Sequence, residues 1–481
     1  MAELARLGGI LGCAGLALLL VAARRELRLA GLAAWGLGVV LLAAYLAPAG
    51  HGPELAAAAV AGLALAAAGA LVLLRWPWAL AFATLACIPV RIPVTIGSEE
   101  ANLLLPLYGV AAALALAVGW ELLREGGRAP ELGGLARPLA ALIGWTGLTL
   151  AWSDDLRQGA IFLLAFVLPF GLLAFGFARL PWRTRPLAFL VGALAAMAAV
   201  FAAIGVYQWA TRDVFWNPKV IVGNAYAPFY RVNSVFWDPS IYGRFLVVAI
   251  LACLALVLLG ARERTLLALT GAIAVSWTGL LFSFSQSSFV SLIAGVLVAA
   301  GIAWRRRAVA AVVLVSAVLL AVGLATPQVR HSLLHKSKTG LNAATSGRAG
   351  LVSNGLKIAL HHPVVGVGVG GFKRAYAERT GLKGREPKKA ASHSTPVTVA
   401  AETGLPGLAL LAWLAFAALV PALRGLRRSD ASRVSLVVGL TLGAIAVHSL
   451  FYNALFEDPT AWALLGLAAL AVAERRREEA T

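Results

Sequence analysis

The stretch SIYGRFLVVAILACLALVLLG, residues 240–260, decides the fold class of this chain. From Phe245 to Leu259 it holds no charged side chain. Its length is close to the ~20 residues that a helix needs to cross a hydrocarbon core of roughly 30 Å. Similar apolar runs recur along all 481 residues, so a single membrane anchor does not explain the pattern. The sequence therefore predicts a protein that crosses the membrane many times.

The overall composition leads to the same fold class. Hydrophobic residues make up 60% of the chain and charged residues 13%, a balance that excludes an ordinary water-soluble domain. We predict an all-α, polytopic transmembrane helix bundle of about 12–15 spans, forming a single membrane domain over residues 1–481. The expected spans are 5–23, 30–47, 55–74, 77–95, 102–122, 137–152, 159–178, 186–210, 240–260, 265–283, 286–303, 309–326, 394–420, 434–454 and 460–474. The span 77–95 is the least regular, because Pro89, Arg91 and Pro93 interrupt it.

Charge in the connections predicts which of them face the cytoplasm, where loops of membrane proteins collect lysine and arginine. Alternate connections are arginine-rich, and we expect them inside: Arg24, Arg25 and Arg28; Arg124, Arg128 and Arg137; Arg179, Arg183 and Arg185; Arg305 to Arg307; Arg424, Arg427, Arg428 and Arg433; Arg475 to Arg477. The connections 48–54, 97–102, 284–286 and 453–460 contain neither residue and are expected outside. By alternation, the longer connections 211–239 and 326–392 are extracytoplasmic too.

The outer connection 326–392 is itself strongly basic. It carries twelve lysines and arginines against two glutamates, a charge of +10 out of a net +19 for the chain. Since the rest of the positive charge follows from topology, we do not expect nucleic acid as a partner. Two explanations remain open for the loop: contact with anionic lipid headgroups of the bilayer, or a site for a polyanionic or pyrophosphate-bearing substrate.

Within this loop, residues 345–363 have helical apolar spacing and predict a short amphipathic helix lying on the membrane. Its N-terminus would hold Arg348 facing an anion. The glycine-rich stretch 363–372 lacks the strand and helix of a nucleotide site, and we expect its backbone to approach the membrane or a sugar chain closely. His331 and His335 have no carboxylate or cysteine nearby and are expected to be solvated.

His393 stands where the basic loop meets the next apolar run. An imidazole at the mouth of a membrane cavity can take a proton from an incoming hydroxyl, which makes it a candidate general base. An interfacial histidine that only bonds to backbone is the competing interpretation. A second polar segment surrounds Arg231, Asp238 and Arg244. Arg244 lies inside the span 240–260, so it should face protein, a carboxylate such as Asp238, or an anionic ligand.

The order of these features resembles the O-antigen ligase and polymerase superfamily, which joins polysaccharides from lipid carriers. The resemblance covers residues 230–407, and four segments carry it: Arg231-Val-Asn-Ser with Asp238-Pro239; Phe282-Ser-Phe-Ser-Gln286-Ser287-Ser; Ser346-Gly-Arg348 with His362-Pro-Val-Val-Gly366-Val-Gly368-Val-Gly-Gly-Phe372; and His393-Ser-Thr-Pro with Glu402-Thr-Gly404-Leu-Pro-Gly407. The serine turn usually carries an arginine where this chain has Gln286, and the histidine is usually followed by asparagine where this chain has Ser394.

The resemblance implies an inverting, metal-independent glycosyl transfer that needs no cofactor. The donor would be an undecaprenyl-diphosphate-linked glycan and the acceptor a hydroxyl of a glycan, lipid or protein, on the outer face of the bacterial cytoplasmic membrane. His393 would be the base and Arg348 would bind the diphosphate. Arg231 or Arg244 would supply the second phosphate contact in place of the arginine that Gln286 replaces. Gln286, Ser287 and Asp238 would join the substrate-binding site. A transporter for an anionic solute and a scaffold that recruits anionic polymers are the competing functions.

Overall fold

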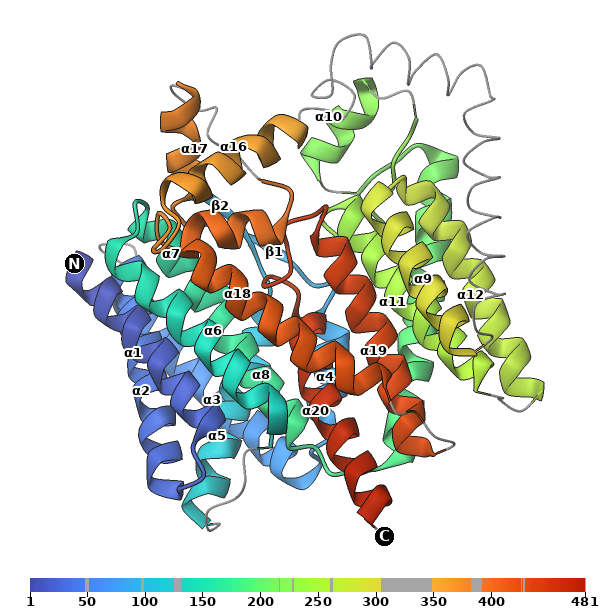
Figure 1. The fold of residues 1–481 in the computed structure, drawn as a ribbon, viewed down its shortest axis with the longest axis horizontal. Coiled ribbons are helices and arrows are strands. Elements are labelled where there is room, and N and C mark those ends of the chain that lie inside the picture. Colours follow the sequence, from blue (N-terminus) through green and yellow to red (C-terminus); the bar gives the residue numbers. More distant parts are fainter. Residues whose placement is uncertain are drawn as a thin grey trace.

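The computed structural model describes residues 1–47, 52–96, 99–124, 131–215, 217–226, 229–259, 263–303, 348–381, 392–424, 426 and 429–480. The chain folds as an all-α membrane bundle with one small β-hairpin (Figure 1). Among these residues, eleven helices are long and apolar enough to cross a membrane. The predicted span 309–326, and His331 and His335, lie outside the described residues.

The first half of the chain builds one side of the bundle. Its elements are α1 (Ala2–Val21), α2 (Arg25–Leu46), α3 (Gly52–Arg75), α4 (Ala79–Cys87), β1 (Ile92–Ile96), β2 (Glu99–Leu103), α5 (Leu105–Arg124), the 3₁₀ turn Gly133–Leu135, α6 (Ala136–Thr149), the 3₁₀ turn Leu150–Trp152, α7 (Leu156–Phe162), the π-helical turn Leu163–Val167 and α8 (Leu168–Ala178). The stretch from α7 through α8 forms one continuous membrane span.

The second half supplies the remaining spans and three short helices. Its elements are α9 (Thr184–Thr211), α10 (Pro218–Tyr226), α11 (Pro239–Leu258), α12 (Glu263–Ser283), the helix 286–303, α16 (Arg348–His361), α17 (Phe372–Thr380), α18 (Thr395–Leu423), α19 (Asp430–Ser449) and α20 (Pro459–Ala480). The quoted stretch 240–260 forms α11, and 72% of the residues in its 18-residue apolar segment are buried inside the protein.

The predicted span 77–95 is wrong. Only α4 forms there, with nine residues, and the chain then turns into the hairpin β1–β2, in which Ile92 pairs with Leu103. A proline has no backbone N–H to donate and clashes with the preceding turn, so Pro89 and Pro93 prevent the helix from continuing. The backbone pairs across the hairpin instead.

The two ends of the bundle hold different elements, and the lower end holds a network of ion pairs. The upper end in Figure 1 holds α10, α16 and α17, and the lower end holds the α1–α2 connection and the C-terminus. At the lower end, Arg28 contacts both carboxylate oxygens of Glu131 at 2.9 and 3.0 Å, and Arg179 bridges Glu131 and Glu121 at 2.5 and 2.6 Å. The connections that follow α1, α5 and α8 therefore meet at this end. All three are arginine-rich connections that the sequence predicted to lie on the same side of the membrane.

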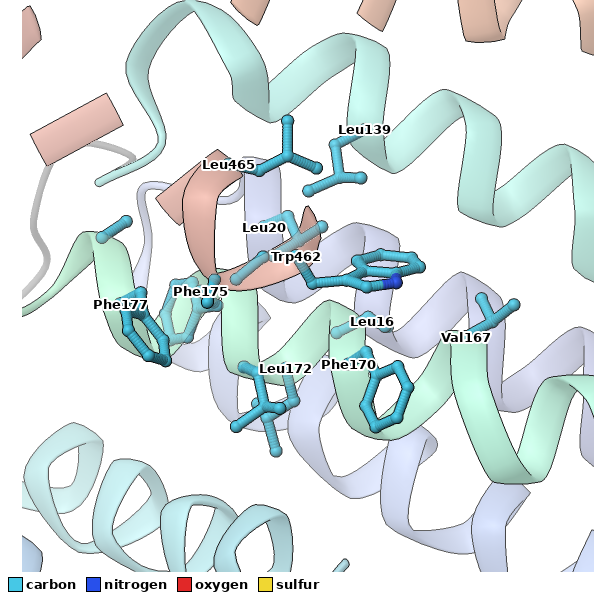
Figure 2. Close-up of a cluster of buried hydrophobic side chains, with 14 of the residues drawn as sticks. Leu16, Leu20, Leu139, Val167, Phe170, Leu172, Phe175, Phe177, Trp462 and Leu465 are labelled. Carbon is cyan, nitrogen blue, oxygen red and sulfur yellow. The ribbon is translucent and has the colours of Figure 1, made fainter. Parts of the chain in front are cut away.

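The main core lies where α1, α6, α8 and α20 pack together (Figure 2). Phe170, Phe175 and Leu172 on α8 are fully buried, and Trp462 from α20 inserts among them with 3% of its surface exposed. Helices α1 and α2 approach closely through glycines, as transmembrane helices often do. A side chain at Gly38 would overlap the backbone of Gly12.

Candidate active site

The start of α11 holds Asp238 and Arg244. Asp238 caps the helix, because its Oδ1 accepts a hydrogen bond from the backbone N–H of Ser240 at 2.6 Å. Arg244 is 3% exposed; its Nε lies 3.0 Å from Oδ2 of Asp458, and its Nη1 donates to the carbonyl of Ala454 at 3.3 Å. Arg244 therefore faces a carboxylate, as expected for an arginine inside a span, but its partner is Asp458. Asp238, the carboxylate named as an example, instead caps the first helical turn.

The serine-rich turn that follows α12 forms a buried hydroxyl cluster. Ser285 Oγ lies 2.8 Å from Ser288 Oγ, and Ser287 Oγ lies 3.0 Å from Nε2 of His448 on α19. Gln286 points away and is exposed. Sequence reasoning missed His448, because it lies within the apolar run predicted as the span 434–454 and no charged residue stands near it in that run.

Arg231 lies against this serine turn. Its Nε donates to the carbonyl of Ser283 at 3.2 Å, and the next backbone N–H, of Val232, donates to the carbonyl of Phe282 at 3.1 Å. The side chain of Asn224 in α10 fixes the Arg231 backbone through two hydrogen bonds of 2.8 and 3.0 Å. The connection 211–239 therefore places a half-buried guanidinium beside a turn that has no arginine of its own.

The connection between α19 and α20 supplies acidic partners that the sequence interpretation did not single out. Besides Asp458, it carries Glu457, whose backbone carbonyl accepts a hydrogen bond from Nη2 of Arg91 at 3.1 Å. Loss of hydration raises the pKa of Glu457, although the nearby charges of Arg91 and Arg244 oppose the shift. The arginine that interrupts the predicted span 77–95 thus lies near the candidate site.

A cavity of about 260 Å³, here called the polar cavity, opens beside this connection. Its walls come from five separate parts of the chain, and its polar lining residues are Thr146, Gln158, Lys373, Ser392, Thr398, Glu402, Thr403, Asn453 and Glu457. The Oε1 of Glu402 on α18 also accepts a hydrogen bond from the backbone N–H of Phe372 at 3.2 Å. Carboxylate, ammonium, amide and hydroxyl groups together suit a ligand rich in hydroxyls.

The glycine-rich stretch forms one wall of the polar cavity. Its backbone N–H groups at Val367 and Gly368 each donate to carbonyls of α18 at 2.9 Å. Gly368 and Gly370 have φ of +83°, and a side chain at either would overlap the backbone of the α6–α7 region, at Ser153 and Gly159. The close approach that glycine allows at these two positions is to protein backbone, and the expected approach to the membrane or a sugar chain stays a prediction.

The helix 345–363 forms as α16, and its packing differs from a helix resting only on lipid. Gly355, Ile358 and Ala359 are buried, and the last two belong to a cluster with Phe372 and with Ala400 of α18. Leu356 and Leu360 remain exposed at 51% and 66%. Arg348 begins the helix, but its side chain is outside the described part of the structure.

His393 lies directly before α18, between the buried residues Ser392 and Ser394. Its φ of +54° is uncommon for a residue with a side chain and costs free energy. Ser392 holds the turn, because its Oγ donates to the carbonyl of Ser394 at 2.7 Å and contacts Thr398 Oγ1 at 2.5 Å. Ser392 also lines the polar cavity. His393, whose imidazole is half-buried, follows Ser392 directly in the chain.

The motif that begins with Glu402 interrupts α18. Gly404 has φ +71° and ψ −177°, and the backbone N–H of Leu405 donates to the carbonyl of Pro363 at 2.7 Å. Trp145 Nε1 fixes the same region by donating to the Thr403 carbonyl at 2.8 Å. The kink ties the glycine-rich stretch to α18 and sets the position of Glu402. Within the described residues, no group of three or more His, Cys, Asp and Glu side chains could hold a metal ion.

A comparison with protein families matches the part of the chain that holds much of this candidate site. A family model described as O-antigen ligase matches residues 271–412, less than a third of the chain. The matched region contains the serine turn, α16, the glycine-rich stretch, His393 and Glu402, whereas Arg231 and Arg244 lie before it. No match was found among curated proteins. The family match confirms the resemblance drawn from the sequence: residues 271–412 of this multi-pass membrane protein are similar to the O-antigen ligase family.

Proposed function

We propose that this protein is a membrane glycosyltransferase that moves a glycan from undecaprenyl diphosphate to an acceptor hydroxyl. The reaction would take place at the upper end of the bundle, on the outer face of the bacterial cytoplasmic membrane. The observation that carries the proposal is the junction at Ala454. Its carbonyl accepts a hydrogen bond from Arg244 beside the serine turn, and the same residue lines the polar cavity. Arg244 therefore links the serine turn, beside which Arg231 lies, to the cavity whose lining suits a sugar.

In the proposed reaction, the imidazole of His393 removes the proton from the acceptor hydroxyl. The resulting oxygen attacks the anomeric carbon from the side opposite the diphosphate, a new carbon–oxygen bond forms with inversion, and undecaprenyl diphosphate leaves with the electron pair of the broken bond. The imidazolium then returns its proton to water. A positive φ at His393 is consistent with this role, because strained residues concentrate at functional sites.

The two candidate arginines receive different roles. Arg231 is half-buried at the rim of the serine turn, where its Nε donates to the Ser283 carbonyl, so it is the better candidate for the second phosphate contact. Arg244 is enclosed and held by Asp458 and Ala454, so it is a positioning residue that fixes the α19–α20 connection. Arg348 remains the proposed first contact to the diphosphate. Gln286, Ser287 and Asp238 shape the surrounding turn and helix start.

The proposal is tested with purified protein and an undecaprenyl-diphosphate-linked glycan, following glycan transfer to an acceptor. We expect His393→Ala to abolish transfer, and His361→Ala, an exposed histidine of α16, to leave it unchanged. We expect Arg231→Ala to raise the KM for the donor while the protein stays folded. If no donor yields a product, and vesicles containing the protein instead show solute flux, the protein is a transporter and the proposal fails.

A further inference from the structure

A cavity of about 940 Å³, open along most of its surface, lies between the start of α4 and the start of α9, close in the chain to Arg179 at the end of α8. The lining has two parts: Arg183 and Arg185 at the mouth, and an apolar wall that includes Trp78, Phe82 and Phe189. None of these residues takes part in the proposed glycosyl transfer.

The mouth of this cavity is positively charged. Arg183 and Arg185 are exposed, and neither forms a hydrogen bond or an ion pair with another residue in the described ranges. Arg185 instead lies over the Phe189 ring, at 5.8 Å from its centre. Arg183 is the N-cap of α9 and offers no side-chain cap, so the first backbone N–H groups of the helix add to the positive potential.

The wall of the cavity is apolar and is built by tertiary contact. Trp78 is 8% exposed, and its Nε1 donates to the carbonyl of Pro181 at 3.2 Å, which fixes the start of α4 against the α8–α9 connection. Phe189 is 60% exposed along the membrane-facing side of α9. Gly192 leaves the wall open, because a side chain there would meet no atom within 4 Å.

We propose that this cavity binds one anionic phospholipid, with its phosphate between Arg183 and Arg185 and an acyl chain along Phe82, Phe189 and Gly192. An apolar crevice at the edge of the hydrocarbon layer is filled more favourably by an acyl chain than by water. Charge complementarity selects the headgroup, because a zwitterionic lipid brings its own cation close to the two guanidinium groups. Tryptophan at the membrane interface is the usual neighbour of such headgroups.

The headgroup part is tested by native mass spectrometry of the full chain in detergent, titrated with phosphatidylglycerol or with phosphatidylcholine of the same acyl chains. We expect the intact protein to prefer phosphatidylglycerol. Each interfacial arginine changes the affinity for an anionic lipid roughly fivefold, so Arg183→Gln/Arg185→Gln should weaken phosphatidylglycerol binding roughly 25-fold and leave phosphatidylcholine unchanged. The matched control, Arg24→Gln/Arg476→Gln, removes two exposed arginines from the lower end outside the cavity and should bind both lipids normally.

The acyl part is tested by filling the cavity. Gly192→Phe has room to fold and should weaken binding of both lipids, whereas Gly271→Phe on α12, where the new side chain also meets open space, should not. Equal affinity of the intact protein for the two lipids would overturn the proposal, as would equal binding by Gly192→Phe and Gly271→Phe. Displacement of the lipid by millimolar inorganic phosphate would show a free-anion site instead and would overturn it too.

Discussion

The free energy of unfolding should depend strongly on the buried ion pair between Arg244 and Asp458. Arg244→Gln leaves Asp458 as an uncompensated carboxylate, in a place where the two side chains are 3% and 8% exposed. Asp458→Asn leaves the guanidinium without its counter-charge, while the new amide oxygen still accepts the Thr460 N–H that Asp458 Oδ1 receives at 2.9 Å. The two single changes therefore remove the charge pair without removing the cap of α20.

The expected magnitude follows from the burial of the pair. Removing one partner of a buried ion pair lowers the free energy of unfolding by roughly 3–5 kcal/mol, whereas replacing both by neutral groups costs much less. We therefore expect Arg244→Gln/Asp458→Asn to be destabilised by about 2 kcal/mol or less, which gives a coupling energy of several kcal/mol. At about 2.1 cal/mol/K per residue, the 481 residues unfolding together change entropy by roughly 1 kcal/mol/K, so each single variant should lose roughly 3–5 °C in Tm.

The assay uses the protein's own thiols. Cys13 and Cys253 are buried, and a fluorogenic maleimide reports their exposure as the detergent-solubilised protein is heated. Arg433→Gln serves as control, because its contact to Asp430 joins two side chains that are 49% and 58% exposed and should contribute little. If the double variant loses as much Tm as the two single variants together, the pair is not coupled and the reasoning is refuted.

Three further predictions concern the candidate site. Gly368 has φ +83°, and Gly368→Ala would force a side chain into the backbone of Ser153, so it should lower the free energy of unfolding by more than ~2 kcal/mol. The control Gly62→Ala places its side chain in open space and should change the Tm little. Equal shifts in Tm would contradict this. Burial raises the pKa of Glu457, so the folded protein binds more protons than the unfolded one, and stability falls as pH rises from the ordinary glutamate pKa through the raised one. Glu457→Gln should flatten the measured curve of Tm against pH over that range. An unchanged curve would contradict this prediction. His393→Gly should relieve the strain at φ +54° and stabilise the protein by about 1 kcal/mol in thermal unfolding while transfer is lost, and retained transfer would rule out His393 as the base.

Most membrane spans could be predicted because a span depends on its own hydrophobicity. α11 and α19 begin and end within a few residues of the predicted 240–260 and 434–454. The predicted spans 137–152 and 460–474 form as α6 and α20, which are not among the eleven helices long and apolar enough to cross a membrane. The span 77–95 does not form, because two prolines removed backbone hydrogen bonds and the chain formed a hairpin instead. Local backbone chemistry there outweighed the apolar pattern.

The candidate site was predicted only where a residue carries an unusual local signal. His393 at a loop–helix boundary and Arg244 inside an apolar run are conspicuous in the sequence, and the structure describes both. Lys373 belongs to the basic connection 326–392 and Glu402 to the motif after His393, yet nothing in their spacing shows that they face one cavity. His448 lies within an ordinary apolar run, and only its 3.0 Å contact to Ser287 identifies it.

The sequence by itself determined that this protein is a many-span membrane bundle, and which of its connections carry the positive charge. Those properties are sums over neighbouring residues, so they need no knowledge of distant contacts. Tertiary structure decided the pairing. Arg244 reaches Ala454, 210 positions away in the chain, and meets Asp458 instead of its near neighbour Asp238. The direction of each side chain around a helix, and the helix packed against it, set such partners, and neither is encoded in a local stretch of sequence.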